Sequence, residues 1–390
     1  MFFMYNIFTL NKIAKCGTKK FDSNYSITDT MDGADAVMVR SASMHETELP
    51  KTLKAIARAG AGVNNIPVDK CSELGIVVFN TPGANANAVK ELVLAGLLMS
   101  SRKVLPAIEW AKTLKGNGAE VGKMVEKGKG AFAGPEIMGK TLGVIGLGAI
   151  GVLVANAAHS LGMKVLGYDP YVSVVNAWGL HSHVAHTKSL DEIYAKSDYI
   201  TVHVPLIADT KGMINKESLE KCKNGVRVLN FSRDALINDD DMIAALESGK
   251  VSCYVSDFPT DAVIGVENVI AIPHLGASSP ESEDNCAIMA ADELIDFLEN
   301  GNIKNSVNLP NVSMPKSGDV RVCIVHKNIP AVLTQISGAI SNGKNNNIEN
   351  MASSAKKDYA YTLLDITGSV TDSAIDAIKG IDGIISVRTI

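Results

Sequence analysis

A glycine-rich turn in the middle of the chain constrains its fold more than any other feature. The apolar run Thr141–Ile145 leads directly into the sequence GLGAIG, in which Gly146, Gly148 and Gly151 have the spacing GxGxxG. Gly146 permits a tight turn, Gly148 lets the backbone approach a pyrophosphate, and Gly151 allows a helix to pack closely. The N-terminus of that helix then faces the negative phosphates. The pattern predicts a strand, turn and helix that bind a dinucleotide.

An acidic residue at the end of the next apolar run indicates which dinucleotide. Asp169 follows Val165–Tyr168, and no lysine or arginine lies beside it in the sequence YDPY. A carboxylate at this position accepts hydrogen bonds from a ribose 2′-hydroxyl and repels a 2′-phosphate. We therefore expect NAD rather than NADP. The alternative is that Asp169 only caps the following turn.

Length and charge exclude some classes of protein. The chain has 390 residues, of which 46% are hydrophobic, and this suits two or three domains, each with its own core. The formal net charge of -5 provides no basic surface for nucleic acid. The lysines between Lys112 and Lys129 alternate with glycine and glutamate, so we expect a solvated loop there.

The cysteines and the first residues indicate a compartment. The six cysteines are scattered without CxxC spacing, which is typical of reduced thiols. The apolar start Met1–Leu10 lacks a basic leader and is too short to span a bilayer, so it is predicted to be a first strand. We therefore expect a cytoplasmic protein with no membrane partner.

The position of the glycine turn, far from the N-terminus, predicts a domain before it. Short apolar runs in that earlier part predict a second parallel sheet, followed by a long helix over Asn87–Ser101. The fold class expected is α/β, with a doubly wound, Rossmann-type parallel domain at 98–280. It is inserted into a flavodoxin-like α/β domain formed by residues 1–97 and 281–308. The predicted strands are Ala36–Val39, Ala55–Ala57, Ile76–Phe79, Val165–Tyr168, Tyr199–His203, Val226–Leu229, Ser252–Val255 and Val269–Ile272.

The end of the chain predicts a third, smaller domain. Residues 309–319 carry two prolines and no apolar period, which is typical of a semi-rigid linker. Residues 320–390 then show the order βαββαβ, which is ferredoxin-like. The predicted elements are Arg321–Val325, Pro330–Ser341, Ile348–Ala352, Ala360–Ile366, Thr371–Ile378 and Ile384–Arg388.

Seven motifs in a fixed order carry a family resemblance over nearly the whole chain. They are Met38–Ser41, Ala59–Asn65, Asn80–Gly83, Gly146–Gly151, His203–Pro205, Asn230–Arg233 and Pro273–Ala277. Together they resemble the D-2-hydroxyacid dehydrogenases, and within that family the branch that oxidises 3-phosphoglycerate. Residues 320–390 resemble the ACT regulatory domain that many of these enzymes carry. The resemblance implies an NAD-dependent enzyme.

The resemblance also implies three catalytic residues. His274 is the acid and base, since imidazole titrates near neutral pH and can take a proton as hydride leaves; otherwise it is a structural histidine. Arg233 binds the substrate carboxylate and carbonyl, unless it is a surface arginine paired with Asp234. Asp261 stands where the family has a glutamate that orients the histidine, and its alternative role is to cap a turn.

The implied cofactor and substrate sites include further residues. The cofactor residues are Gly146, Gly148, Ala149, Ile150, Gly151, Asp169, His203, Val204, Pro205, Phe231, Ser232, Arg233, Asp257, His274 and Gly276. The substrate residues are Arg40, Ser41, Arg58, Gly62, Val63 and Asn64. A phosphate is close to dianionic at neutral pH, so Arg40 and Arg58 are expected to bind it, unless both are ordinary surface arginines. The backbone N–H groups of Gly62–Asn64 suit a carboxylate.

Two further segments contain side chains that could bind a metal or a small ligand. His181–His186 contains three histidines, but it lacks a carboxylate or thiol at ligand spacing and falls where a third strand belongs, so we expect no metal. Val325–Pro330 resembles the loop with which ACT domains of these enzymes bind L-serine across a dimer interface. His326, Asn328 and Asn347 are the implied contacts. The alternative is a domain that only forms oligomers, and Ala331 in place of the usual glycine favours it.

The sequence thus predicts NAD-dependent oxidation of 3-phospho-D-glycerate to 3-phosphohydroxypyruvate, the first step of the phosphorylated route to serine. A homodimer or homotetramer is expected, because the predicted long helices and the ACT-like end both suit a symmetric interface. Two alternatives stay open. One is a reductase of hydroxypyruvate, glyoxylate or another 2-keto acid. The other is a non-enzymatic, NAD-sensing protein like the corepressors that share this fold.

Overall fold

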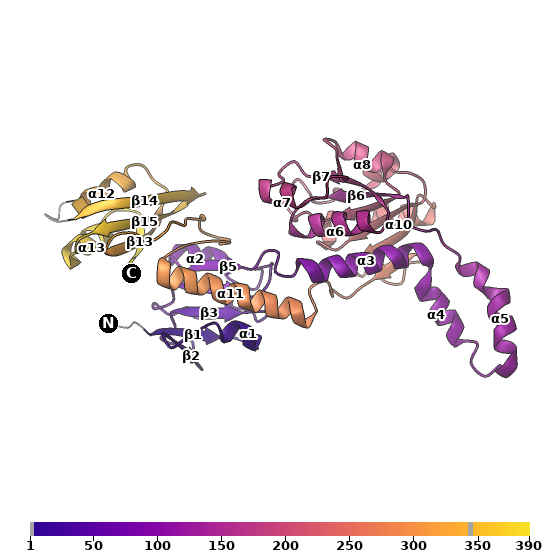
Figure 1. The fold of residues 1–390 in the computed structure, drawn as a ribbon, viewed down its shortest axis with the longest axis horizontal. Helices are drawn as coiled ribbons and strands as arrows, with labels where there is room; N and C mark the ends of the chain where they lie inside the picture. The colour runs from indigo at the N-terminus through magenta and orange to yellow at the C-terminus, as the bar shows by residue number, and fades with distance from the viewer. Residues whose placement is uncertain (1–3, 342–345) are drawn as a thin grey trace. The chain divides into compact units, whose positions relative to one another are not determined.

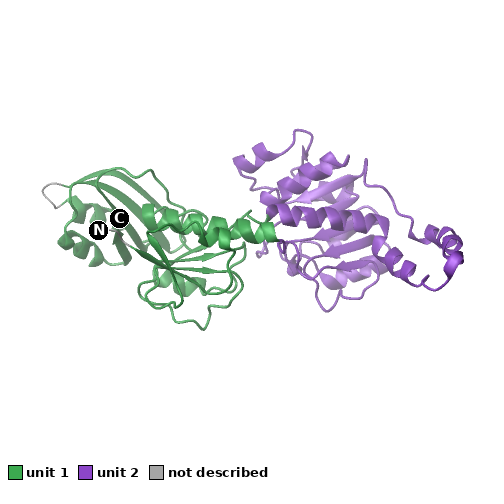
Figure 2. Cartoon of the chain, turned by 60° about the horizontal axis from the view of Figure 1, so that its bottom comes forward, with its two compact units in different colours: residues 1–85, 280–390 green, residues 86–279 purple. Residues whose placement is uncertain are grey.

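The chain folds into two compact units, which Figure 2 shows in different colours. The structure is a computed structural model that describes residues 4–341 and 346–390. One unit comprises Met1–Asn85 together with Pro280–Ile390, and the other comprises Ala86–Ser279, so the second unit is inserted into the first. Residues 280–390 all belong to one unit. The finer division into a substrate domain, a linker and a regulatory domain therefore stays a prediction.

The inserted unit is built on a seven-stranded parallel sheet with the order β12-β11-β10-β9-β6-β7-β8. The strand order reverses between β6 and β9, as in a doubly wound dinucleotide-binding fold, which confirms the Rossmann-type prediction. Its strands are β6 (Thr141–Ile145), β7 (Lys164–Tyr168), β8 (Ala185–His186), β9 (Tyr199–Val202), β10 (Val226–Asn230), β11 (Val251–Ser256) and β12 (Val269–Ala271).

Helices cover both faces of this sheet because successive strand residues point to opposite sides. Val144 packs in a core with α3 and α6, whereas Ile145 packs in a second core with α8 and α10 (Figure 1). Several helices begin at a serine or asparagine whose side chain accepts a first-turn N–H group. The helices are α3 (Ala86–Arg102), α6 (Ala149–Ser160), α7 (Val174–Gly179), α8 (Leu190–Lys196), α9 (Lys216–Lys221) and α10 (Asp239–Glu247).

Two sequence predictions within this unit were wrong about the backbone. The segment from Lys112 to Lys129 is mainly helical rather than a loop, with α4 (Val104–Lys112) and α5 (Val121–Gly128) extending from the sheet (Figure 1). The rings of Trp110 and Phe132 lie 5.2 Å apart and hold these helices together, although the lysines are solvent-exposed as expected. The third strand predicted at 181–186 is only β8, because just Ala185 and His186 pair with β7.

The other unit contains a five-stranded parallel sheet with the order β2-β1-β3-β4-β5. The sequence predicted a parallel sheet here, but it did not predict β2 or the strand order. The helix α11 (Pro280–Asn300) returns the chain to this sheet, and its Ala290, Leu294 and Phe297 join the core that lies on it. The other elements are β1 (Tyr5–Thr9), α1 (Lys15–Thr18), β2 (Tyr25–Thr28), β3 (Ala36–Val39), β4 (Ala55–Arg58), α2 (Val68–Glu73) and β5 (Val77–Asn80).

Residues 320–390 form an antiparallel sheet with the order β14-β15-β13-β16, and the βαββαβ element order agrees with the sequence prediction. Ile336 and Ile378 of its two helices cover one face, and the other face packs through Tyr361 and Leu363 against Phe297 of α11. The preceding segment is packed too, since Leu309 is fully buried. The elements are β13 (Val320–Lys327), α12 (Val332–Ser341), β14 (Asn347–Lys356), β15 (Tyr359–Thr367), α13 (Asp372–Lys379) and β16 (Ile384–Thr389).

Across residues 4–341 and 346–390, no helix combines the length and the apolar character that crossing a membrane requires.

Candidate active site

The glycine turn has the close contacts that its sequence predicts. Gly146 has φ +93°, and a methyl group there would lie 2.5 Å from the carbonyl oxygen of His203. A methyl group on Gly151 would lie 1.9 Å from the carbonyl oxygen of Gly146. At Gly148, by contrast, a methyl group would meet no atom within 4 Å. The turn is therefore tight on the protein side and open where a pyrophosphate would approach, with Ala149 starting α6.

Asp169 holds this turn through its carboxylate. One oxygen accepts the N–H of Leu147 at 2.8 Å, and the other accepts the N–H of Tyr171 at 2.8 Å. The second bond is the turn cap that the sequence left open as an alternative. Because a carboxylate has about four lone-pair directions, Asp169 keeps acceptor capacity for a ribose hydroxyl. Capping and cofactor binding are therefore compatible.

His203 lies beside the glycine turn, at the end of β9. Its Nε2 atom is 2.9 Å from the Thr201 hydroxyl, while its Nδ1 atom is buried without a partner among the described residues. Burial lowers the pKa of His203 to about 4, so the ring is neutral at pH 7. An unpartnered buried nitrogen at this place fits the presence of a ligand. Val204 follows, with its side chain near Gly146, and the carbonyl of Pro205 accepts the Thr210 hydroxyl at 2.6 Å.

The turn after β10 presents Arg233. The Asn230 side chain is buried; it donates to the Arg233 carbonyl at 2.7 Å and accepts the Ser232 N–H at 3.1 Å. These two hydrogen bonds to one side-chain amide fix the turn. The exposed Arg233 side chain lies over the Phe258 ring, with its guanidinium carbon 5.5 Å from the ring centre. The ring of Phe231 is buried in the core against α3, so a contact of this predicted cofactor residue with a ligand would come from its backbone.

A second turn, after β12, presents His274. The Asp257 carboxylate, 1% exposed, accepts the N–H groups of Leu275 at 2.7 Å and Gly276 at 2.8 Å. Burial raises the pKa of Asp257, against the opposing effect of these two bonds. His274 itself has φ +54°, a conformation that is costly for a residue with a side chain. Asp257 therefore positions the turn that holds His274.

Phe258 links the two predicted catalytic residues. Its ring centre lies 4.4 Å from that of His274, and the guanidinium of Arg233 lies over the same ring. Sequence reasoning missed this role, and the only signal was that Phe258 follows Asp257 directly. Asp261 is exposed at the start of a turn, and no hydrogen bond joins it to His274 in the described part of the chain.

The predicted substrate arginines lie at adjacent strand ends in the other unit. Arg40 directly follows β3 and Arg58 ends β4, and the Arg58 Nε atom donates to the Arg40 carbonyl at 3.0 Å. Arg40 also forms an ion pair with Glu283 at 2.6 Å, with both side chains about 40% exposed. The carboxyl edge of the parallel sheet therefore gathers two cations, as expected, but one of them has an acidic partner that the sequence did not predict.

The other predicted substrate residues lie in the loops at the same edge. Ser41 is exposed, and its hydroxyl accepts the Asn11 side-chain amide at 3.2 Å. The carbonyl of Asn64 binds the His45 ring at 2.8 Å. Within the described residues, the N–H groups of Gly62, Val63 and Asn64 donate no hydrogen bond to the protein. These three donors are available to an anion.

The predicted regulatory residues divide into two groups. His326 is 3% exposed, and its ring nitrogens lie 2.8 Å from the Lys327 carbonyl and 2.9 Å from the Thr362 hydroxyl. Burial lowers the pKa of His326. His326 and Asn328 line one cavity of about 360 Å³. Asn347 does not line it; its side chain donates to Glu349 at 2.9 Å.

The fold and the glycine turn define a dinucleotide-binding protein of the dehydrogenase type, and comparison with known proteins identifies the type of its dinucleotide-binding part. Residues 94–276 match the D-isomer specific 2-hydroxyacid dehydrogenase, NAD binding domain. This part of the chain is therefore an NAD-binding domain of the D-2-hydroxyacid dehydrogenase type.

Individual relatives agree with this family. The chain is 35% identical over 288 residues to the D-3-phosphoglycerate dehydrogenase of Archaeoglobus fulgidus, covering 71% of this chain and 52% of that one. It is 33% identical over 289 residues to the human D-3-phosphoglycerate dehydrogenase, covering 71% and 51%. The chain thus spans about half the length of these relatives.

A solved structure agrees as well. The NAD+-bound 3-phosphoglycerate dehydrogenase of Entamoeba histolytica superposes with a TM-score of 0.59 and 28% identity, over 78% of this chain and 98% of that one.

Proposed function

We propose that the protein catalyses NAD-dependent oxidation of 3-phospho-D-glycerate to 3-phosphohydroxypyruvate, the first step of the phosphorylated route to serine. The observation that carries the proposal is the pair of turns that present Arg233 and His274 against the same ring, Phe258. Both turns lie within the matched NAD-binding domain. The phosphoglycerate dehydrogenases among the relatives support the choice of substrate.

In the proposed mechanism, His274 takes the proton from the substrate 2-hydroxyl group and returns it to solvent after the reaction. The Arg233 guanidinium binds the substrate carboxylate and the oxygen that becomes the carbonyl, because its planar fork matches two oxygens. Asp257 holds the His274 turn in its strained conformation, so the ring needs no reorganisation during the reaction. NAD, when bound, supplies the hydride acceptor.

The preference for NAD is proposed to rest on Asp169. Its carboxylate is fixed by the Leu147 and Tyr171 N–H groups, so it cannot turn away from a 2′-phosphate. Repulsion between a fixed carboxylate and a phosphate disfavours NADP.

The phosphate of the substrate is proposed to bind Arg40 and Arg58. The Glu283 carboxylate now paired with Arg40 is about 40% exposed, so a dianionic phosphate can displace it at small cost. Gly62–Asn64 would contribute N–H groups to the substrate carboxylate.

Residues 320–390 are proposed to be an ACT-type regulatory domain that binds L-serine. The cavity lined by His326, Asn328 and Ser353 is polar enough for an amino acid. Because both His326 nitrogens are already hydrogen-bonded, this residue would shape the cavity and Asn328 would contact the ligand.

A symmetric homodimer is proposed through α4 and α5. These helices bury no residue in the described chain, and they expose the apolar side chains of Leu105, Ile108 and Met124. Apolar side chains gathered on an extension of this kind are typical of an interface between copies.

The first test is NADH oxidation with 3-phosphohydroxypyruvate, hydroxypyruvate and glyoxylate at matched concentrations, with NADPH as the cofactor control. The proposal expects the phosphorylated acid and NADH to be preferred. His274→Gln should lower kcat roughly 10²–10⁴-fold, while the exposed His186→Gln should leave it unchanged. Preference for an unphosphorylated acid would instead favour a general reductase. Absence of turnover with all three acids would favour an NAD-sensing binding protein.

The regulatory proposal has a separate test. Calorimetry with L-serine should give a heat that Asn328→Ala removes, and NADH oxidation should fall as L-serine is added. No heat with L-serine would leave residues 320–390 with a purely structural or oligomeric role.

A further inference from the structure

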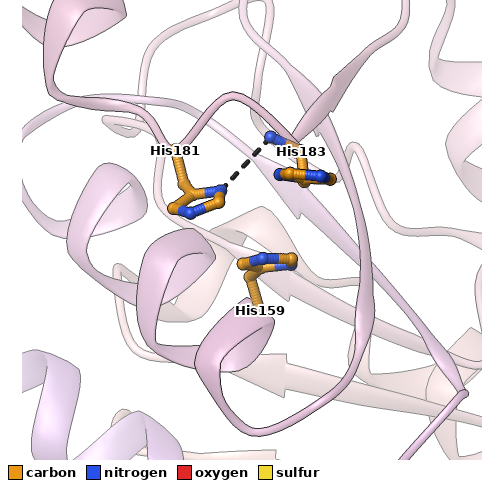
Figure 3. A group of neighbouring side chains, drawn as sticks. All are labelled: His159, His181 and His183. Atoms are coloured by element: carbon orange, nitrogen blue, oxygen red, sulfur yellow. Dashed lines mark hydrogen bonds between the residues drawn. The ribbon is translucent and has the colours of Figure 1, made fainter.

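Three histidines come together on the NAD-binding unit, away from every residue that the proposed reaction uses. His159 lies in the last turn of α6, and His181 and His183 lie in the loop between α7 and β8 (Figure 3). One ring nitrogen of each lies within 4.8 Å of the other two. Spacing along the sequence could not reveal this group, because His159 is 22 residues before His181.

The rings face one another closely. The ring centres of His159 and His181 are 4.3 Å apart, and His159 and His183 are stacked at 5.3 Å with an angle of 10° between their planes. His159 is half-buried, whereas His181 and His183 are exposed. Three imidazoles gathered at an accessible position form a group of nitrogen ligands that suits transition metals.

A neighbouring asparagine fixes the loop against the helix. Asn156 of α6 accepts the His181 N–H at 2.8 Å and donates to the Gly179 carbonyl at 2.8 Å. Asn156 and His159 are three residues apart, and so they lie on the same side of α6. The two bonds therefore hold the loop over His159 without a metal, and the site is largely formed in advance.

The helix also favours a cation here. His159 is the penultimate residue of α6, whose carboxyl-terminal end carries the negative pole of the helix dipole. A dication bound at that end is stabilised by the last carbonyl groups as well as by its ligands.

We infer that His159, His181 and His183 bind a divalent transition metal of the Zn²⁺ class, with water completing the coordination. A tetrahedral ion at about 2.0–2.1 Å from each nitrogen needs the nitrogens about 3.3 Å apart. Rotation of the two exposed side chains supplies this adjustment. The long 3.3 Å hydrogen bond from the His183 N–H to His181 Nδ1, dashed in Figure 3, gives way to the metal bond.

The bound ion would fasten the segment 174–184 to α6. This segment connects β7, which ends just before Asp169, with the short edge strand β8. The metal therefore stabilises the segment that follows Asp169 in the sequence, and it takes no part in hydride transfer. The inference does not rest on the proposed substrate.

The test is calorimetric titration of the full chain, free of any affinity tag, with ZnCl₂. We expect one ion per chain. His159→Ala, His181→Ala and His183→Ala should each weaken binding more than tenfold, since loss of even an outer partner of a metal ligand costs roughly 10–100-fold. The matched control His186→Ala, in the adjoining strand β8 and outside the cluster, should bind as the natural chain does. Equal binding by the natural chain and the triple variant would overturn the inference.

A second readout separates this site from cysteine. Co²⁺ bound by three imidazoles and water shows visible bands without thiolate charge transfer. Hydrogen exchange should slow over residues 179–184 when Zn²⁺ is added, and only when all three histidines are present. Thiolate charge transfer, or unchanged exchange in that segment, would contradict the proposal.

Discussion

Two arginines in two regions of the molecule show opposite uses of the same side chain. Arg233, in the turn after β10, is exposed and lies over an aromatic ring, with one hydrogen bond to the preceding carbonyl. Arg321, in β13, is fully buried and uses its guanidinium to bind both oxygens of Asp365. It also donates to the carbonyls of Asn300, Met314 and Pro315.

The difference lies in what surrounds each guanidinium. The turn at Arg233 is fixed by the buried Asn230, so the arginine itself is left for a ligand. Arg321 instead joins the end of α11, the segment before β13 and the C-terminal sheet. Burial alone would raise the pKa of Asp365, but the Arg321 guanidinium together with the N–H and hydroxyl of Ser317 holds that pKa below its usual range. One arginine is available for chemistry, and the other is a structural connection.

The largest effect is expected at the structural arginine. Asp365→Asn keeps the shape but leaves the Arg321 charge buried without its counterion, so the free energy of unfolding should fall by about 3–5 kcal/mol. Urea unfolding would measure it. The exposed pair of Asp376 and Lys379 provides the control, because Asp376→Asn should cost at most about 0.5 kcal/mol. A small loss in Asp365→Asn would show that the buried pair is dispensable.

The exposed arginine should affect the reaction and leave stability unchanged. Arg233→Lys removes the planar fork, and kcat/KM should fall by about 100-fold, which corresponds to about 2.7 kcal/mol. The free energy of unfolding should stay within about 0.5 kcal/mol of the natural chain. If steady-state kinetics showed no change, Arg233 would be a surface arginine and the proposed mechanism would lose its anion contact.

A buried carboxylate that has no cationic partner provides a third case, in which the free energy of unfolding depends on pH. Glu293 of α11 binds only the Asn305 amide, its second oxygen has no partner among the described residues, and burial raises its pKa to about 8. The unfolded chain ionises at lower pH, so stability is lost as pH rises from about 4.5 to about 8. Glu293→Gln removes this loss and should be more stable by about 2 kcal/mol at pH 9, with little difference near pH 4.

Unfolding at several pH values distinguishes this effect from a general change in α11. Glu281→Gln, at the exposed start of the same helix, is the matched control and should show no such pH dependence. A constant difference between Glu293→Gln and the natural chain at all pH values would contradict the raised pKa.

The smallest effect is expected at Ala331, which has φ +64° where the family usually has glycine. A left-handed residue with a side chain costs about 1–2 kcal/mol, and glycine recovers most of this at some cost in the entropy of the unfolded chain. Ala331→Gly should therefore raise stability by about 0.5 kcal/mol. In the helical part of α12, Ala339→Gly should have the opposite sign and cost about 1 kcal/mol. Thermal unfolding of both variants provides the measurement. A stability change of the same sign in the two variants would contradict backbone strain at Ala331.

Much of the fold was predictable because it follows from patterns of neighbouring residues in the sequence. The apolar runs predicted most strands of both parallel sheets, and GxGxxG with Asp169 predicted the dinucleotide turn. Gly146 and Gly151 make close contacts with nearby backbone, and Gly148 leaves open space. The roles of Arg233 and His274 were implied by resemblance alone and stay predictions. The helices α4 and α5 were missed because the Trp110 and Phe132 contact that supports them joins residues distant in sequence.

The sequence by itself therefore determined the sheets, the NAD-type turn and the family resemblance. Only the tertiary structure decided which polar side chains are already bonded: His326 was expected to meet a ligand and is bonded within its sheet, while no hydrogen bond joins Asp261 to His274 among the described residues. The tertiary structure also placed Phe258 against the two predicted catalytic residues and brought His159 to His181 and His183. Strand periodicity is a property of neighbouring residues, whereas the partner of a polar side chain depends on which distant backbone groups the fold brings within hydrogen-bond reach.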